Sequence, residues 1–141
     1  MKTAWIVVAD EAIARILERP AGGGELRPVD TLSDPDAHLR EAEMRHGPHG
    51  RRAGNATVPA ADSERHQHAQ LFAARIAERL ADAQRRGVYQ ALHLIAAPRM
   101  LGYLRQALPA SVAAAVASEQ DKDLVQASPA ELAQRLAEAQ P

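Results

Sequence analysis

The residue types best suited to chemistry stand just after short apolar runs of the chain. Asp10 follows the run 4–9, and Arg99 follows the run 91–97 and Pro98. Asp121, Lys122 and Asp123 come shortly after the run 116–119. If these runs are strands of one open α/β sheet, their carboxyl ends form a crevice at the point where the strand order reverses. We therefore predict a ligand-binding crevice there.

An anion is the ligand that this crevice would suit. Pro98 is a typical first residue of a helix, and the free amides of a helix start attract negative charge. The guanidinium of Arg99 adds two donors in a geometry that fits phosphate or carboxylate. The alternative is that these acids and bases are solvated turn residues that form ordinary ion pairs.

Carboxylates near several strand ends also allow metal-dependent phosphoryl transfer, as in a nuclease, which needs acids converging on a pair of cations. Asp10, Glu119 and Asp121 are available, but the run 91–97 has His93 at its centre and no acid. The other histidines do not follow a zinc pattern. We predict no metal ligand, no cofactor and no catalytic residue, and keep the nuclease or small-ligand domain as the alternative function.

A second candidate surface is basic. Residues 44–62 have no apolar period, and they carry Arg45, Arg51 and Arg52 with no acid before Asp62. Such a stretch in a compact domain is typically functional or disordered. We predict a flexible basic loop that binds phosphate groups or an acidic protein, with solvated disorder as the alternative.

Composition excludes several classes of protein. The 141 residues suit one domain, and the net charge of −1 excludes a bulk polycation. The absence of cysteine excludes disulfides, a thiol nucleophile and thiolate metal sites. No apolar run is long enough for a membrane span or a signal peptide, so a cytoplasmic protein is expected. Alanine supplies 31 residues of the 46% hydrophobic fraction, which predicts a core with few bulky side chains.

The candidate residues need a scaffold, and the hydrophobic pattern supplies one. Strands are predicted at 4–9, 14–19, 26–32, 91–97 and 116–119, with residues 22–24 turning the second strand into the third. A long amphipathic helix capped by Asp62 or Ser63 ends near Gly87. Shorter helices follow Pro98 and Ser111, and Ser128-Pro129-Ala130-Glu131 is a capping box that opens the last helix.

This order predicts a single three-layer α/β domain, residues 1–141. The simplest topology is a five-stranded mixed sheet of order 3-2-1-4-5 with strand 2 antiparallel, the ribonuclease-H-like arrangement. Right-handed crossovers place the first covering helices on one face, which leaves mainly the last helix for the other. A homodimer that supplies further cover is therefore expected.

Several segments together resemble a known family. They are Thr3 to Asp10 with Ala14-Arg15-Ile16, the helix positions Phe72, Ala73, Ile76, Ala77 and Leu80, the run from Leu94 to Arg105, and Asp121-Lys122-Asp123-Leu124 with Ser128, Pro129 and Glu131. The chain is similar to the bacterial host attachment proteins, described as required for attachment to host cells. The most specific part is Ala-Pro-Arg-x-Leu-Gly-x-Leu-Arg, which adds Arg105 to the ligand-binding candidates.

That family in turn resembles the middle domain of archaeal and eukaryotic release factors. The resemblance implies a basic loop, at about 44–62, where relatives meet the ribosome or transfer RNA. A Gly-Gly-Gln loop acts in peptidyl-tRNA hydrolysis in those factors, but Gly47, Gly50 and Gly54 are isolated here. The expected function is therefore a non-enzymatic binding or adaptor module that contacts ribosome, RNA or an acidic protein through the loop.

Overall fold

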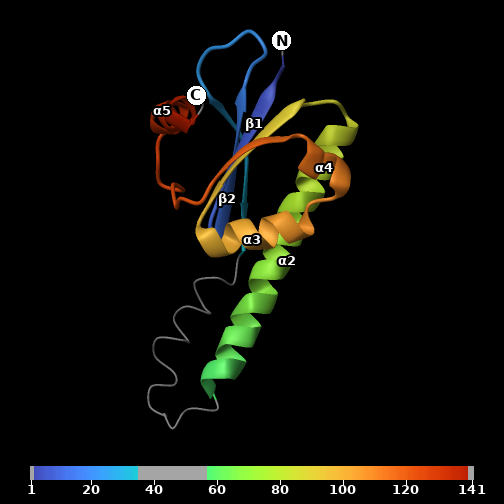
Figure 1. Ribbon diagram of the computed structural model, residues 1–141, viewed down its shortest axis with the longest axis vertical. Helices are drawn as coiled ribbons and strands as arrows, with labels where there is room; N and C mark the ends of the chain where they lie inside the picture. The colour runs from blue at the N-terminus through green and yellow to red at the C-terminus, as the bar shows by residue number, and fades with distance from the viewer. Residues whose placement is uncertain (1, 35–56, 140–141) are drawn as a thin grey trace.

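The computed structural model describes residues 2–34 and 57–139. Within them the chain forms a five-stranded sheet and four helices (Figure 1). In chain order these elements are β1 (Ala4–Ala9), β2 (Ile13–Arg19), β3 (Arg27–Ser33), α2 (Thr57–Arg85), β4 (Ala91–Ala96), α3 (Pro98–Ala107), α4 (Ala110–Ala114), β5 (Val116–Gln120) and α5 (Pro129–Ala139).

The strand order is β3-β2-β1-β4-β5, which confirms the predicted topology. β2 is antiparallel to both β1 and β3, whereas β4 is parallel to β1 and β5. The turn between β2 and β3 contains Gly23 and Gly24 at φ values of 89° and 107°, a backbone region that favours glycine. The glycine run is therefore a hairpin turn, as predicted, and the ribonuclease-H-like assignment stays a prediction.

The central strand β1 is buried on both faces. Trp5, Val7 and Ala9 belong to the larger core cluster, which contains the inner residues of α2, α3 and α4. Ile6 and Val8 belong to the smaller cluster under α5. The alternation follows from the period of two along a strand, and it makes three layers with the sheet in the middle.

Small side chains bring α2 close to the sheet. Ala69, Ala73 and Ala77 are buried on its inner face, between the bulkier Phe72 and Ile76. Figure 1 shows α2 in green running well beyond the ends of the strands, beside α3. The alanine-rich composition thus forms a compact core, as its pattern predicted.

The second face depends on α5 alone among the described helices. Leu132 and Leu136 pack on Ile6, Val8 and Ile95. The capping box is complete, because the amide of Glu131 donates to Ser128 Oγ at 3.1 Å and the amide of Ser128 donates to Glu131 Oε1 at 2.8 Å. The amide lowers the pKa of Glu131, and the hydroxyl adds to this effect. The homodimer expected from this thin cover stays a prediction.

The helix α2 begins earlier than the sequence predicted. The helix begins at Thr57, so positions 62 and 63 lie inside it instead of at its start, and residues 57–62 are helical instead of part of a loop. Pro59 is compatible with this start because a helix leaves its first amides without intrahelical partners. Ala60 and Ala61 then favour helix. The remainder of the predicted loop, with Arg45, Arg51 and Arg52, lies outside the described residues.

Candidate functional site

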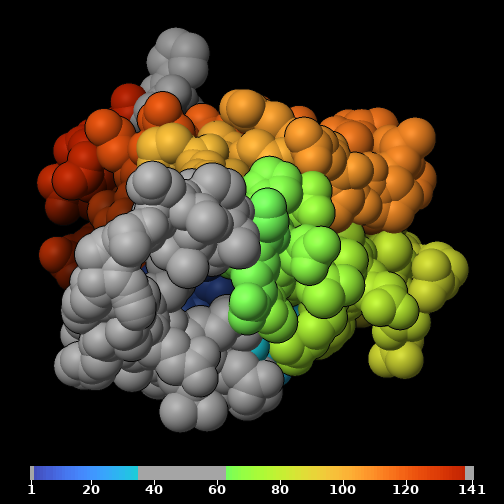
Figure 2. Space-filling model, turned by 90° about the horizontal axis from the view of Figure 1, so that it is seen from below, coloured from blue at the N-terminus to red at the C-terminus, as the bar shows by residue number. Residues whose placement is uncertain are grey.

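The carboxyl ends of β1 and β4 meet at one edge of the sheet, where the strand order reverses. The Ala97 amide donates to the Ala9 carbonyl at 3.4 Å and ties the two strand ends together. Asp10 follows directly, and its Oδ1 accepts the amides of Ala12 and Ile13, each at 2.8 Å. One carboxylate oxygen of Asp10 therefore stabilises the turn into β2. Figure 2 looks at this edge, with α2 in green and α3 in light orange above it.

The first turn of α3 lies at the same edge. Pro98 occupies its first position, and the N-cap residue is Ala97, which has no side chain able to accept a hydrogen bond. The first intrahelical bond runs from the Leu101 amide to the Ala97 carbonyl at 2.9 Å. The amides before that bond have no intrahelical partner, and amides at the start of a helix favour an anion.

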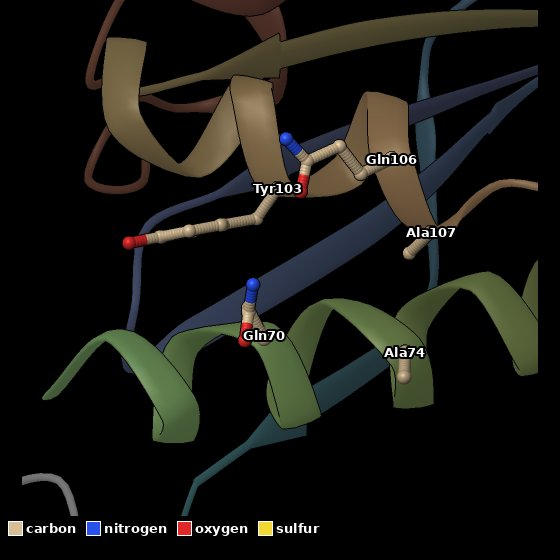
Figure 3. Close-up of a pocket in the computed structure, with 5 residues that line it drawn as sticks. All are labelled: Gln70, Ala74, Tyr103, Gln106 and Ala107. Carbon is tan, nitrogen blue, oxygen red and sulfur yellow. The ribbon is translucent and has the colours of Figure 1, made fainter. Parts of the chain in front are cut away.

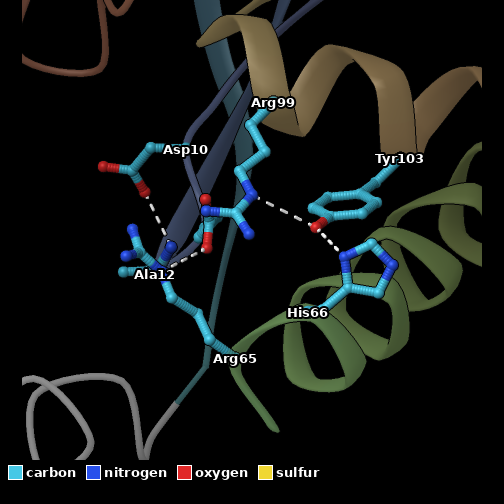
Figure 4. Close-up of polar contacts among 7 residues, drawn as sticks. Asp10, Ala12, Arg65, His66, Arg99 and Tyr103 are labelled. Carbon is cyan, nitrogen blue, oxygen red and sulfur yellow. Dashed lines mark hydrogen bonds and ion pairs between the residues drawn. The ribbon is translucent and has the colours of Figure 1, made fainter. Parts of the chain in front are cut away.

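Arg99 and Tyr103 connect this helix start to α2. The Nε of Arg99 donates to the Tyr103 hydroxyl at 3.3 Å, one turn further along α3. The same hydroxyl is hydrogen-bonded to Nδ1 of His66 on α2. Figure 4 shows Arg99, Tyr103 and His66 in this chain of contacts, with Asp10 in the same close-up. The side chains of two helices therefore form one polar cluster at the edge of the sheet.

Arg65 extends from α2 toward the turn after β1. Its Nε contacts Glu11 Oε1 at 3.2 Å, and the two side chains are 46% and 25% exposed. Because this ion pair is partly solvated, it holds the guanidinium near the edge at little energetic cost. The edge thus presents two arginines, Arg65 and Arg99.

Beyond the polar cluster, a groove of about 240 Å³ runs between α2 and α3. Its walls come from Gln70 and Ala74 on α2 and from Tyr103, Gln106 and Ala107 on α3. Figure 3 shows Gln70 extending from α2 toward α3 and Gln106 lying along α3, with Ala74 and Ala107 farther along the two helices. The side-chain amides of Gln70 and Gln106 are exposed and make no hydrogen bond with other groups that the structure describes. We call this feature the α2–α3 groove.

The structure divides the residues predicted for the crevice. Asp10 and Arg99 lie at the same edge, but Arg105 points to β5, where its Nε and Nη2 donate to Glu119 Oε1 at 2.8 and 2.6 Å. Glu119, with a smaller contribution from Asp121, raises the pKa of Arg105. Lys122 and Asp123 are exposed after β5. Two of the six candidates, Asp10 and Arg99, therefore lie where β1 and β4 end, and the other four lie near β5, which is parallel to β4.

Among the side chains that the structure describes, no three histidines or acids gather closely enough to hold a metal ion. His66 and His68 point apart, since His66 contacts Tyr103 and His68 lies 3.9 Å from Glu64. His93 is 2% exposed, and its Nδ1 lies 2.6 Å from Ser118 Oγ. It is a buried, hydrogen-bonded strand residue, as predicted.

Residues that the sequence analysis did not select complete the site. His66, Gln70 and Ala74 follow one another at four-residue steps, and so do Arg99, Tyr103 and Ala107. This spacing places each set on one face of its helix. The rows were detectable in the sequence, but the contact between them depends on the packing of α2 against α3.

The model of a family described as "Protein required for attachment to host cells" matches residues 5–136. No curated protein matches the chain. None of the helices within the described ranges is both long and apolar enough to cross a membrane.

Proposed function

This chain belongs to the family of proteins required for attachment to host cells, and from that premise we propose that it is a non-enzymatic module that binds RNA. The binding surface is the edge of the sheet at the carboxyl ends of β1 and β4, together with the basic segment that joins β3 to α2. Ribosomal or transfer RNA is the partner class. The site of action is the cytoplasm.

The observation that carries this proposal is the first turn of α3. Its amides lack a side-chain cap, and the guanidinium of Arg99 is held beside them by the Tyr103 hydroxyl. A helix start with an adjacent arginine is a favourable place for a phosphate group, because amide dipoles and a fixed cation act on the same charge. Arg65 adds a second guanidinium at that edge.

The course of the described chain supports the same surface. The end of β3, at Ser33, and the start of α2, at Thr57, both lie on the side of the molecule where β1 and β4 end (Figure 1). The intervening sequence contains Arg45, Arg51 and Arg52. Positive charge that tracks a phosphate backbone is the usual source of sequence-independent affinity for nucleic acid.

The relation to the release-factor middle domain, with its ribonuclease-H-like fold, is part of this proposal. Release activity is not, since the chain has no Gly-Gly-Gln. Nuclease activity is not part of the proposal either. Glu119 is paired with Arg105, and Asp10 stabilises its own turn. These two acids are engaged in structural roles, so the geometry favours binding over cleavage.

The salt dependence of RNA binding tests the proposal. We would measure the affinity for transfer RNA and for a mixed single-stranded RNA by fluorescence anisotropy at several KCl concentrations, with wild type and Arg51→Ala/Arg52→Ala. The matched control is Arg85→Ala/Arg86→Ala, because this pair lies at the other end of α2 and contacts Asp82. Each lost phosphate contact lowers the slope of log K against log salt by about 0.7 for single strands.

The expected result is a slope smaller by about 1.4 in the Arg51/Arg52 variant and an unchanged slope in the control. RNA affinity that is absent, or that responds equally to both double variants, contradicts the proposal. A wild type that ignores RNA but is thermally stabilised by phosphorylated metabolites would instead assign the α3 helix start to a small ligand.

A further inference from the structure

We infer that the α2–α3 groove holds one unpaired nucleotide, with its base between Gln70 and Gln106 and its phosphate toward Arg99 and His66. This inference rests on the proposed RNA-binding function and gives it a specific subsite. The chemistry recognised is a nucleoside monophosphate unit, whether it is part of a strand or free.

Two matched rows of side chains build the site. His66, Gln70 and Ala74 on α2 face Tyr103, Gln106 and Ala107 on α3. The row on α3 continues back to Arg99, whose guanidinium reaches the Tyr103 hydroxyl. The polarity of the groove therefore changes along its length. The Arg99 guanidinium lies at the sheet edge, the two glutamine amides follow, and the two alanines line the far end.

The amides supply the recognition of a base. A glutamine side chain donates and accepts hydrogen bonds at once, and in this way it reads the edge of a nucleobase in two places. Gln70 and Gln106 come from different helices and line the same groove (Figure 3), and their exposed side-chain amides have no hydrogen-bond partner among the described groups. Their hydrogen-bonding capacity is thus available to a ligand that enters between the helices.

The walls suit a planar ring. Ala74 and Ala107 leave the far end of the groove without bulk, and the ring of Tyr103 forms part of one wall. Tyr103 is fixed in place, because its hydroxyl is hydrogen-bonded to His66 and their rings meet edge to face. Tyr103 is 6% exposed, so it bounds the groove as a rigid and largely buried wall, and the glutamine amides are the groups that hold the base.

The site selects unpaired nucleotides. Bases in an A-form duplex are stacked, and their major-groove edges are inaccessible to side chains, whereas an unpaired base can leave the stack and enter a pocket. The cations at the sheet edge, in contrast, contact phosphates of either form. Binding of single strands therefore uses both features, and binding of duplexes uses the edge alone.

The test replaces the two amides with apolar side chains of similar size. Gln70→Leu/Gln106→Leu removes the hydrogen bonds, and Gln134→Leu, on the exposed surface of α5, is the matched control. Affinities for a single-stranded RNA decamer and for a duplex of the same sequence are measured by anisotropy. Adenosine and guanosine monophosphates are titrated while the side-chain amide signals of Gln70 and Gln106 are followed by NMR. Thermal unfolding verifies that each variant folds.

We expect the double variant to bind the single strand about fivefold more weakly or worse, while the duplex affinity of both variants stays at the wild-type value. Free monophosphates should shift both glutamine amide signals. If single-strand affinity is unchanged in the double variant and the amide signals do not move, the inference is overturned while the RNA-binding function stands. If monophosphates shift the amides but wild type binds no RNA, the groove takes free nucleotides and the proposed function fails instead.

Discussion

Tyr103 of α3 and His66 of α2 are joined twice, by a hydrogen bond between the phenol oxygen and Nδ1 and by an edge-to-face ring contact with centroids 4.9 Å apart. The Arg99 Nε donates to the same oxygen at 3.3 Å. One hydroxyl therefore links two helices, which also pack together through the larger core, and contacts a cation. This contact is where the sheet edge passes into the α2–α3 groove.

Removal of that hydroxyl should affect both folding and binding. Tyr103→Phe keeps the ring in its buried place but loses the bonds to His66 and Arg99, so we expect a loss of about 1 kcal/mol in the free energy of unfolding. Single-stranded RNA should also bind more weakly, because Arg99 loses its support. Urea unfolding and fluorescence anisotropy measure the two effects.

Tyr89→Phe is the matched control for this variant. Tyr89 is equally buried, and its hydroxyl donates to the Leu80 carbonyl at 2.8 Å inside the larger core. Burial raises the pKa of Tyr89 to about 12, so the hydroxyl stays protonated as a donor. A similar loss of stability with unchanged RNA affinity is expected. Equal weakening of RNA binding by both variants would mean that Tyr103 acts only through stability.

The two arginines of α3 should differ in their effect on anion binding. Arg99 lies at the sheet edge beside the uncapped amides, whereas Arg105 donates twice to Glu119. Arg99→Ala is therefore expected to weaken RNA binding and to lower its salt dependence by about one phosphate contact. Arg105→Ala should leave both quantities unchanged. The reverse ranking would place the anion site near β5 and reject the sheet edge.

The sequence predicted the scaffold better than the site. The alternation along Ala4–Ala9 and the proline at Pro98 depend on local physics, so the strand order and the start of α3 follow from them. Whether Arg105 reaches the crevice depends on a competing acid, Glu119, on another element. The groove escaped prediction because its four-residue rows become a site only when α2 packs on α3. The start of α2 was misplaced because Asp62 and Ser63 resemble a cap, although the preceding alanines favour helix.

Stability should depend on pH through His93. Burial, reinforced by the charge of Arg19, lowers the pKa of this histidine below its ordinary value of 6.5. Arg19 Nη2 lies 3.5 Å from Nε2 and Ser118 Oγ lies 2.6 Å from Nδ1, so the neutral ring fits with its proton on Nδ1. Protonation of Nε2 would bring two cations together.

The sign follows from linkage. As the pH falls below 6.5, the unfolded chain binds a proton at His93 before the folded chain does. The contribution of His93 to the free energy of unfolding is therefore complete above pH 6.5, and it declines as the pH falls toward the pKa of the folded state. The slope for one group reaches about 1.4 kcal/mol per pH unit. Urea unfolding of wild type and His93→Gln at pH 7.5 and 5.5 isolates this contribution, since the other histidines are common to both. An identical decline in the two proteins would contradict the prediction.

The attachment of α5 should depend on Arg15. This β2 side chain donates through Nη1 to the carbonyls of Val125 at 2.9 Å and Ala127 at 2.6 Å, just before the capping box. Arg15→Met keeps most of the aliphatic stem and loses both charge-assisted bonds, so we expect a loss of about 1.5–3 kcal/mol. Hydrogen exchange should accelerate most in α5, because Arg15 holds the segment that leads into it.

Arg27→Met serves as the control for an arginine lost from the neighbouring strand. Arg27 lies on β3, is 65% exposed and pairs with Glu18 at 2.6 Å. An exposed ion pair of this kind contributes about 0–1 kcal/mol, and exchange in α5 should not respond to it. If Arg15→Met is as mild as Arg27→Met, or if its exchange increases are spread evenly over the sheet, then the leucines of α5 alone hold that helix in place. A selective increase of exchange in α5 would show instead that Arg15, near the end of the sheet where β1 stops, helps to hold α5 against the sheet.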